Sequence, residues 1–149
     1  MRRTAGFLLV LLVLAGCDSS DPAFDIADYV GTYEGTRTVT DSDGSTDTED
    51  ISFTISADTD AQTVTFALRP EAGSSEVLPG TYDEDGIEAL LDAGIARIGF
   101  SVSRDGSVTG TFSAFNASGT ISGTLTPSRF DLLFRDEDGR LQTEIRTSR

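Results

Sequence analysis

This chain has only a few types of side chain that can perform acid–base, nucleophilic or metal chemistry. It has 25 acidic residues and 11 arginines but no histidine and no lysine, and Cys17 is its single cysteine. The absence of histidine and lysine excludes a Ser–His or Cys–His pair, a Ser–Lys dyad and the usual zinc ligand sets. We therefore expect no catalytic residues, no resident cofactor and no metal centre.

Carboxylate pairs are the remaining catalytic option. Two acids can hydrolyse a glycosidic bond when an apolar pocket holds one of them protonated. Nearly all the acids of this chain fall in expected turns or on the expected polar faces of strands, where nothing raises their affinity for protons. A carboxylate-based enzyme is therefore the third of three functional hypotheses, and the sequence favours a protein that is not an enzyme.

Three acidic segments raise the question of calcium, a cation that prefers oxygen ligands. None of them follows the spaced Asp-x-Asp-x-Asp-Gly loop, and Asp-x-Asp-Gly is also an ordinary hairpin turn. We interpret the segments as turns, and the sequence leaves calcium binding open. The acids concerned are Asp41, Asp43, Asp47, Glu49 and Asp50, then Asp83 and Asp85, then Asp136 and Asp138.

The N-terminal residues have the order of charge and hydrophobicity that directs export. Arg2 and Arg3 precede an unbroken apolar run from Phe7 to Leu14, which is typical of a signal peptide. A helix from Ala5 to Gly16 would rise roughly 18 Å at about 1.5 Å per residue, well short of the roughly 30 Å hydrocarbon core of a bilayer. The segment is therefore predicted to be a signal helix rather than a transmembrane anchor.

The apolar run ends in Leu14, Ala15, Gly16 and Cys17, which resembles the lipobox of bacterial lipoproteins. The resemblance implies that the chain is cut before Cys17, that the Cys17 thiol carries a diacylglyceryl group and that the freed amine is acylated, with palmitate among the acyl groups. At about 0.8 kcal/mol per buried methylene, two or three such chains hold a protein on a bilayer. We expect a protein anchored to a membrane by its lipid, facing the periplasm or the cell exterior.

The cleavage implied by this motif divides the chain into three parts. Residues 1–16 are the expected signal peptide, residues 17–28 the lipidated cysteine with a short tether, and residues 29–149 a single folded domain. Asp18 resembles an inner-membrane retention signal of some bacteria, so the choice between inner and outer membrane stays open. The exported part has nine arginines and all 25 acids, a formal charge of −16, which repels nucleic acid and anionic membrane surfaces.

From Gly31 onward the apolar residues recur with period two, which indicates strands with one buried and one polar face. Asp-Gly dipeptides and prolines separate the runs as turn residues do. The pattern predicts an all-β fold, an antiparallel meander of about eight to ten strands, with Ile87 to Leu91 open between a strand and a helical turn. The alternating residues are Tyr33 and Val39; Ile51, Phe53 and Ile55; Val64, Phe66 and Leu68; Ile98, Phe100 and Val102; Val108 and Phe112; Ile121 and Leu125; Phe130, Leu132 and Phe134; Leu141 and Ile145.

A recurring Gly-Thr-apolar tripeptide favours a closed β-barrel over the alternative, a β-sandwich. Residues two apart in a strand share a face, so each glycine lies on the inner face beside the apolar residue. Inward glycines let strands coil sharply, as closure of a barrel requires. The tripeptide begins at Gly31, Gly80, Gly110, Gly119 and Gly123.

The start of the first strand resembles the lipocalin and calycin barrels. A possible helical turn from Phe24 to Tyr29 precedes Gly31-Thr32-Tyr33, where the lipocalin signature is Gly-x-Trp with an arginine from the last strand packed over the indole. Tyr33 takes the place of the tryptophan, and the resemblance makes Arg140 or Arg146 the candidate for the arginine. The implied fold is a lipocalin-like β-barrel, and the implied function is carriage of a small apolar molecule inside it.

The aromatic residues of the expected strands could line a ligand cavity or fill the interior, and barrel geometry favours filling. One hypothesis is therefore a membrane-anchored barrel that binds a small apolar ligand. The other is a structural or interaction module of the cell envelope with a filled core, which recognises a protein or polysaccharide through its loops. The aromatic residues are Phe53, Phe66, Phe100, Phe112, Phe130 and Phe134.

Overall fold

The computed structural model describes residues 24–149 apart from residues 72, 115 and 116. The lipobox Leu14 to Cys17, the signal helix expected before it and the proposed retention residue Asp18 lie outside the described residues. In the described part of the chain, no helix is both long and apolar enough to cross a membrane.

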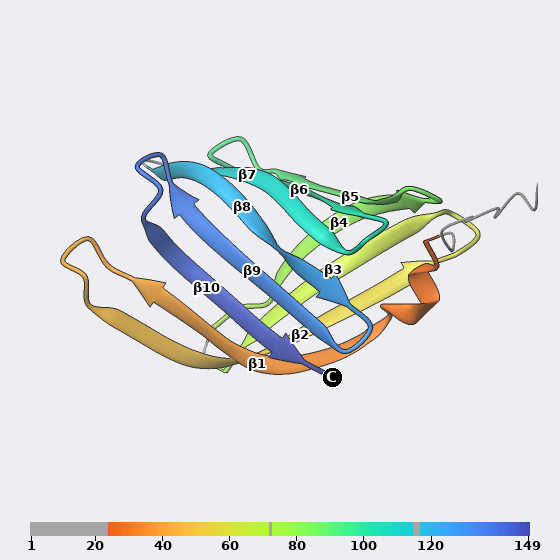
Figure 1. Ribbon diagram of the computed structural model, residues 1–149, viewed down its shortest axis with the longest axis horizontal. Helices are drawn as coiled ribbons and strands as arrows, with labels where there is room; N and C mark the ends of the chain where they lie inside the picture. The colour runs from red at the N-terminus through yellow and green to blue at the C-terminus, as the bar shows by residue number, and fades with distance from the viewer. Residues whose placement is uncertain (1–23, 72, 115–116) are drawn as a thin grey trace, which may run out of the picture.

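Ten antiparallel strands form one closed barrel in which each strand pairs with its neighbours in the chain, and β1 pairs with β10 to close the ring (Figure 1). The all-β meander is confirmed at the upper end of its predicted strand number, and the barrel rather than the sandwich is correct. The segment from Ile87 to Leu91, which the sequence left undecided between a strand and a helical turn, lies within strand β5. The elements are η1 (Ile26–Asp28), β1 (Gly31–Thr40), β2 (Thr46–Asp58), β3 (Thr63–Pro70), β4 (Glu76–Asp83), β5 (Gly86–Asp92), β6 (Ala96–Ser103), β7 (Ser107–Ala114), β8 (Ala117–Thr126), β9 (Arg129–Asp136) and β10 (Leu141–Ser148).

The meander gives the barrel two distinct ends. At the end where β1 begins and β10 stops lies the short 3₁₀ helix η1, and we call this the helix end. The other end carries the β1–β2, β3–β4, β5–β6 and β9–β10 connections, and we call this the loop end. In Figure 1 the β1–β2 and β9–β10 connections lie at the left and η1 at the right.

Aromatic side chains fill the middle of the barrel. Phe53 packs edge-on against Phe130 with ring centroids 4.6 Å apart, and Phe66 packs against Phe100 at 5.2 Å. Such pairs each add about 0.5–1.5 kcal/mol beyond the free energy of burying their area. The set extends through buried aliphatic residues to Tyr33 near the helix end, so the prediction of a filled interior is correct for this part of the barrel.

Helix η1 covers one end of that core. Asp25 caps it, since its side chain accepts a hydrogen bond of 3.0 Å from the backbone N–H of Ala27. Phe24 and Ile26 are buried against the barrel. Residues 24–149 thus contain the ten strands, the ladder that closes them and the buried core, so we expect this part of the chain to fold on its own.

Glycines on the inner face allow the backbones of neighbouring strands to approach closely. Gly110 lies opposite Phe100, and Gly119 lies opposite Phe112. A Cβ atom at Gly119 would overlap the carbonyl oxygen of Arg135. A Cβ at Gly99 would meet the flexible side chain of Leu90 at 3.2 Å and the carbonyl oxygen of Ala89 at 3.6 Å, an ordinary contact distance. The inner-face glycine of β8 is therefore required by sterics, and Gly99 on the outer face is not.

Alanine at Gly119 is expected to lower the free energy of unfolding by about 2 kcal/mol, the usual scale of overpacking against a rigid neighbour. Alanine at Gly99 is the matched control and should change it by less than about 0.5 kcal/mol. Equilibrium urea unfolding of residues 24–149, followed by far-ultraviolet circular dichroism, measures both. Coincident transitions for the two variants would contradict the steric argument.

Candidate functional site

The interior of the barrel is hollow toward the loop end. A cavity of about 340 Å³ opens there, within the size range of small-ligand sites and near its lower limit. Its lining is almost wholly apolar and comes from seven strands. The lining residues are Phe53, Phe66, Leu68, Glu76, Val77, Leu78, Leu91, Ile98, Phe100, Leu132, Phe134 and Ile145.

The cavity and the filled core share a boundary. Phe53, Phe66 and Phe100 are buried in the aromatic core and also line the cavity. The barrel is therefore filled toward η1 and hollow toward the loops. Its aromatic residues fill the interior in the first part and line a cavity in the second. Phe112 and Phe134 are only partly buried against the core, with ring centroids 5.6 Å apart.

One side of the cavity is bounded by a stretch of barrel wall without cross-strand hydrogen bonds. The ladder between β4 and β5 joins only Gly80–Asp83 to Gly86–Ala89. Toward the loop end the two strands diverge, beginning at Pro79, which has no N–H to donate. Leu78 and Leu91, one from each diverging segment, both line the cavity, so apolar side chains rather than a ladder bound the cavity on this side.

Apolar side chains are exposed beside this divergence. Val77 is 51% exposed and belongs to the cavity lining, and Leu90 on the neighbouring strand is 48% exposed. The lining therefore reaches from the interior to the protein surface along β4.

Three charged side chains meet at the loop end of the inner face. Arg37 lies opposite Glu49 in the β1–β2 ladder, and its Nε and Nη2 atoms lie 2.7 and 2.5 Å from Glu49 Oε1. Its Nη1 lies 3.6 Å from Oε1 of Glu76, a cavity-lining residue. One guanidinium is thus shared by two carboxylates, and the group as a whole carries one negative charge.

Tyr33, which we matched to the lipocalin tryptophan, lies near the helix end and is fully buried. Its hydroxyl donates a hydrogen bond of 2.8 Å to the carbonyl oxygen of Tyr29, just after η1. Burial raises the pKa of this phenol above its usual value, and the nearby Arg149 partly offsets the rise. Tyr33 therefore joins η1 to the core rather than contributing to the cavity.

The arginine beside Tyr33 is Arg149, so the expectation that Arg140 or Arg146 takes this role is wrong. Arg149 Nη1 donates to the carbonyl oxygens of Asp28 at 3.2 Å and Pro127 at 3.4 Å. It thereby ties the end of η1 to the β8–β9 turn, one residue after the last strand ends.

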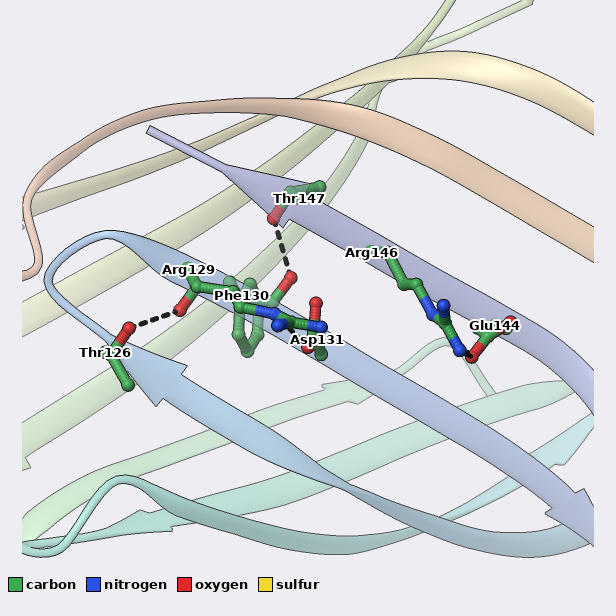
Figure 2. Close-up of polar contacts among 7 residues, drawn as sticks. All are labelled: Thr126, Arg129, Phe130, Asp131, Glu144, Arg146 and Thr147. Carbon is green, nitrogen blue, oxygen red and sulfur yellow. Dashed lines mark hydrogen bonds and ion pairs between the residues drawn. The ribbon is translucent and has the colours of Figure 1, made fainter.

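The alternation of β10 explains this correction. Ile145 and Thr147 are buried, and Thr147 Oγ1 donates to the carbonyl oxygen of Phe130 at 2.6 Å (Figure 2). Arg146, between these two residues in the chain, points away from the interior. Its Nη2 atom lies 2.6 Å from Oε1 of Glu144. Arg140 belongs to the β9–β10 turn at the loop end. Counting on by two from Ile145 reaches Arg149, so strand periodicity was a signal that could have found it.

The acidic loops use their carboxylates to form their own turns. Asp43 Oδ1 accepts hydrogen bonds from the N–H and the hydroxyl of Ser45 at 2.8 and 2.6 Å, which hold the Asp43 pKa below its usual value. Asp136 accepts from the N–H of Arg140 and the amide of Gln142, each at 2.8 Å. Within the described ranges, no group of three or more acidic, histidine or cysteine side chains is placed to hold a metal ion.

A second, larger hollow of about 960 Å³ lies along the outer face of β5 to β8. The exposed Leu90 and the charged Glu88, Arg97 and Glu137 line it. Its lining also includes the hydroxyl residues Ser101, Thr109, Thr111, Ser113, Ser118 and Thr120. This surface is open to solvent. The inner cavity is the better candidate for a small ligand because the barrel wall surrounds it and its lining is apolar.

Comparison with known proteins adds one finding on the fold. No protein-family model and no curated protein matches the chain. Among solved structures, the chain is similar to the crystal structure of a protein of unknown function from the DUF3598 family of Nostoc punctiforme PCC 73102, with a TM-score of 0.61 and 16% sequence identity. The match covers 86% of this chain and 50% of that protein, so the chain spans half its length. The likeness is one of fold. It is consistent with the lipocalin-like barrel.

The buried phenol of Tyr33 predicts a loss of stability in alkali. Because its pKa is raised in the folded state, Tyr33 stays protonated there while the unfolded chain ionises above about pH 10, so the free energy of unfolding falls as pH rises beyond that value. Tyr33→Phe removes this contribution. Urea unfolding of residues 24–149 between pH 8 and 11 should show a shallower decline for the variant, and parallel declines would contradict the assignment.

Proposed function

We propose that this chain is a membrane-anchored lipoprotein whose barrel binds a small apolar ligand in the cavity at its loop end. The observation that carries the proposal is the cavity of about 340 Å³ with a nearly all-apolar lining inside a closed barrel. A closed wall shields such a ligand from water on most sides, which is the main source of affinity for an apolar molecule.

The side chains at the site support binding rather than catalysis. The lining holds one carboxylate, Glu76, and the nearby Arg37 and Glu49 pair with each other. Histidine and lysine are absent from the chain, so the acids and bases most used in hydrolases are lacking. We propose a carrier or sensor of its ligand and not an enzyme.

The lipid anchor in this proposal rests on the sequence from Leu14 to Cys17, which resembles a lipobox. Phe24, the first described residue, is buried near η1, at the end opposite the cavity. A lipid on Cys17 would therefore join the barrel at its filled end. The proposed setting is a membrane surface facing the periplasm or the cell exterior, with nucleic acid repelled by the acidic surface.

A second candidate function is an interaction module of the cell envelope. The hollow on the outer face of β5 to β8 favours it, because a surface of hydroxyl and charged side chains suits a polysaccharide or a protein segment. The two candidates differ in which face of the barrel is used, so variants of adjacent residues on one strand distinguish them.

Filling the cavity is expected to abolish binding of an apolar probe. Leu91 lines the cavity, whereas Leu90, the preceding residue of β5, is exposed on the outer face. With N-phenylnaphthylamine as the fluorescent probe and residues 24–149 as the protein, Leu91→Trp should weaken binding by about tenfold or more, equivalent to about 1.4 kcal/mol. Leu90→Trp, the matched control, should change it by less than about twofold.

Two results would count against the binding barrel. One is a probe that does not bind the unsubstituted protein at all. The other is equal weakening by the two variants, which would place the probe on the surface and favour the outer face.

Removal of the proposed lipid attachment site is expected to release the protein from membranes. In a bacterium that processes lipoproteins, Cys17→Ser should move the protein from the membrane fraction to the soluble or unprocessed pool. Intact-mass measurement of the unsubstituted protein should give a chain that begins at Cys17 and carries acyl groups. A mature chain with a free thiol at this position would refute the anchor, and the barrel's ligand binding would be unaffected by that result.

A further inference from the structure

The charge at the cavity determines which apolar molecules it can accept. Of the described residues that line the cavity, Glu76 alone is charged, and its side chain is 65% exposed. Its carboxylate therefore stands where the cavity meets solvent, close to the place where a polar group of a bound amphiphile would lie. The sign of the charge at this position matters because attraction between unit charges a few ångströms apart is strong near a protein surface.

The cation beside the cavity is already neutralised. Arg37 places two of its nitrogens, Nε and Nη2, within 2.7 Å of Glu49 Oε1, and its third nitrogen faces Glu76 at 3.6 Å. Accepting an anionic ligand would require Arg37 to leave Glu49 or the ligand to approach Glu76 directly. Both changes cost free energy, because the first leaves the partly buried Glu49 without its cation and the second brings two negative charges together.

Other arginines near the cavity lie on the wrong side of the sheet. Arg69, Arg97 and Arg135 each neighbour a cavity-lining residue in sequence, namely Leu68, Ile98 and Phe134. Alternation along a strand directs them to the outer face, so the barrel wall separates their charge from the interior.

We propose that the cavity selects uncharged apolar molecules and excludes anionic amphiphiles of the same shape. Glu76 and the paired Arg37 and Glu49 set this preference together. The inference rests on the proposed ligand binding and deepens it, because it names the chemical class of the ligand.

Two dyes that share one ring system provide the test. N-phenylnaphthylamine is uncharged at neutral pH, and anilinonaphthalene sulfonate adds a sulfonate to the same rings. At low salt, residues 24–149 should bind the uncharged dye at least about tenfold more tightly than the sulfonate. Glu76→Gln should narrow this ratio by about threefold or more, because it removes the charge that repels the sulfonate.

The matched control is Glu88→Gln, which makes the same change of net charge on the exposed outer face of β5. It should leave the ratio unchanged. Equal affinity of the two dyes for the unsubstituted protein, or equal effects of the two variants, would overturn the charge selection while leaving ligand binding intact. Failure of the uncharged dye to bind would overturn the proposed function and this inference with it.

Discussion

Closure of the sheet by the β1–β10 ladder is the constraint on which the rest of the structure depends. In a closed meander each strand has a partner on both sides, and every strand must present one face to the same interior. The number of strands then sets how much space the inner side chains have to fill. Ten strands enclose more volume than the aromatic core occupies, and the excess is left at the loop end as the cavity.

The cavity lies at the loop end because the two ends of the barrel carry different side chains. Tyr33, Phe130 and the residues of η1 pack at the helix end, where Arg149 and the hydroxyl of Tyr33 hold the covering segment in place. The loop end has no comparable cover among the described residues. There the segment of β4 before Gly80 diverges from β5, and charged residues occupy inner-face positions. Filled core and open cavity are thus two consequences of one closed sheet.

Period-two alternation was sufficient to predict the class of fold and most of its strands. Residues such as Phe53 and Ile55 carry that signal locally, and inward glycines such as Gly110 indicated the close strand approach that closure uses. The cavity could not be predicted in the same way, because it depends on neighbours that the chain brings together from distant strands. The ring centroids of Phe66 on β3 and Phe100 on β6 lie 5.2 Å apart although the two strands do not pair, because the barrel closes around them.

The charge pair of the cavity shows why the site is less predictable than the fold. Arg37 and Glu49 face each other across a hairpin, so their contact follows from the β1–β2 register. Glu76 joins them from β4, a strand that does not pair with β1, and only the curvature of the closed wall brings it near. Because barrels of similar shape host many functions, these side chains carry more information on the ligand than the fold does. An interior in which Arg37 is already paired favours ligands that need no counter-charge.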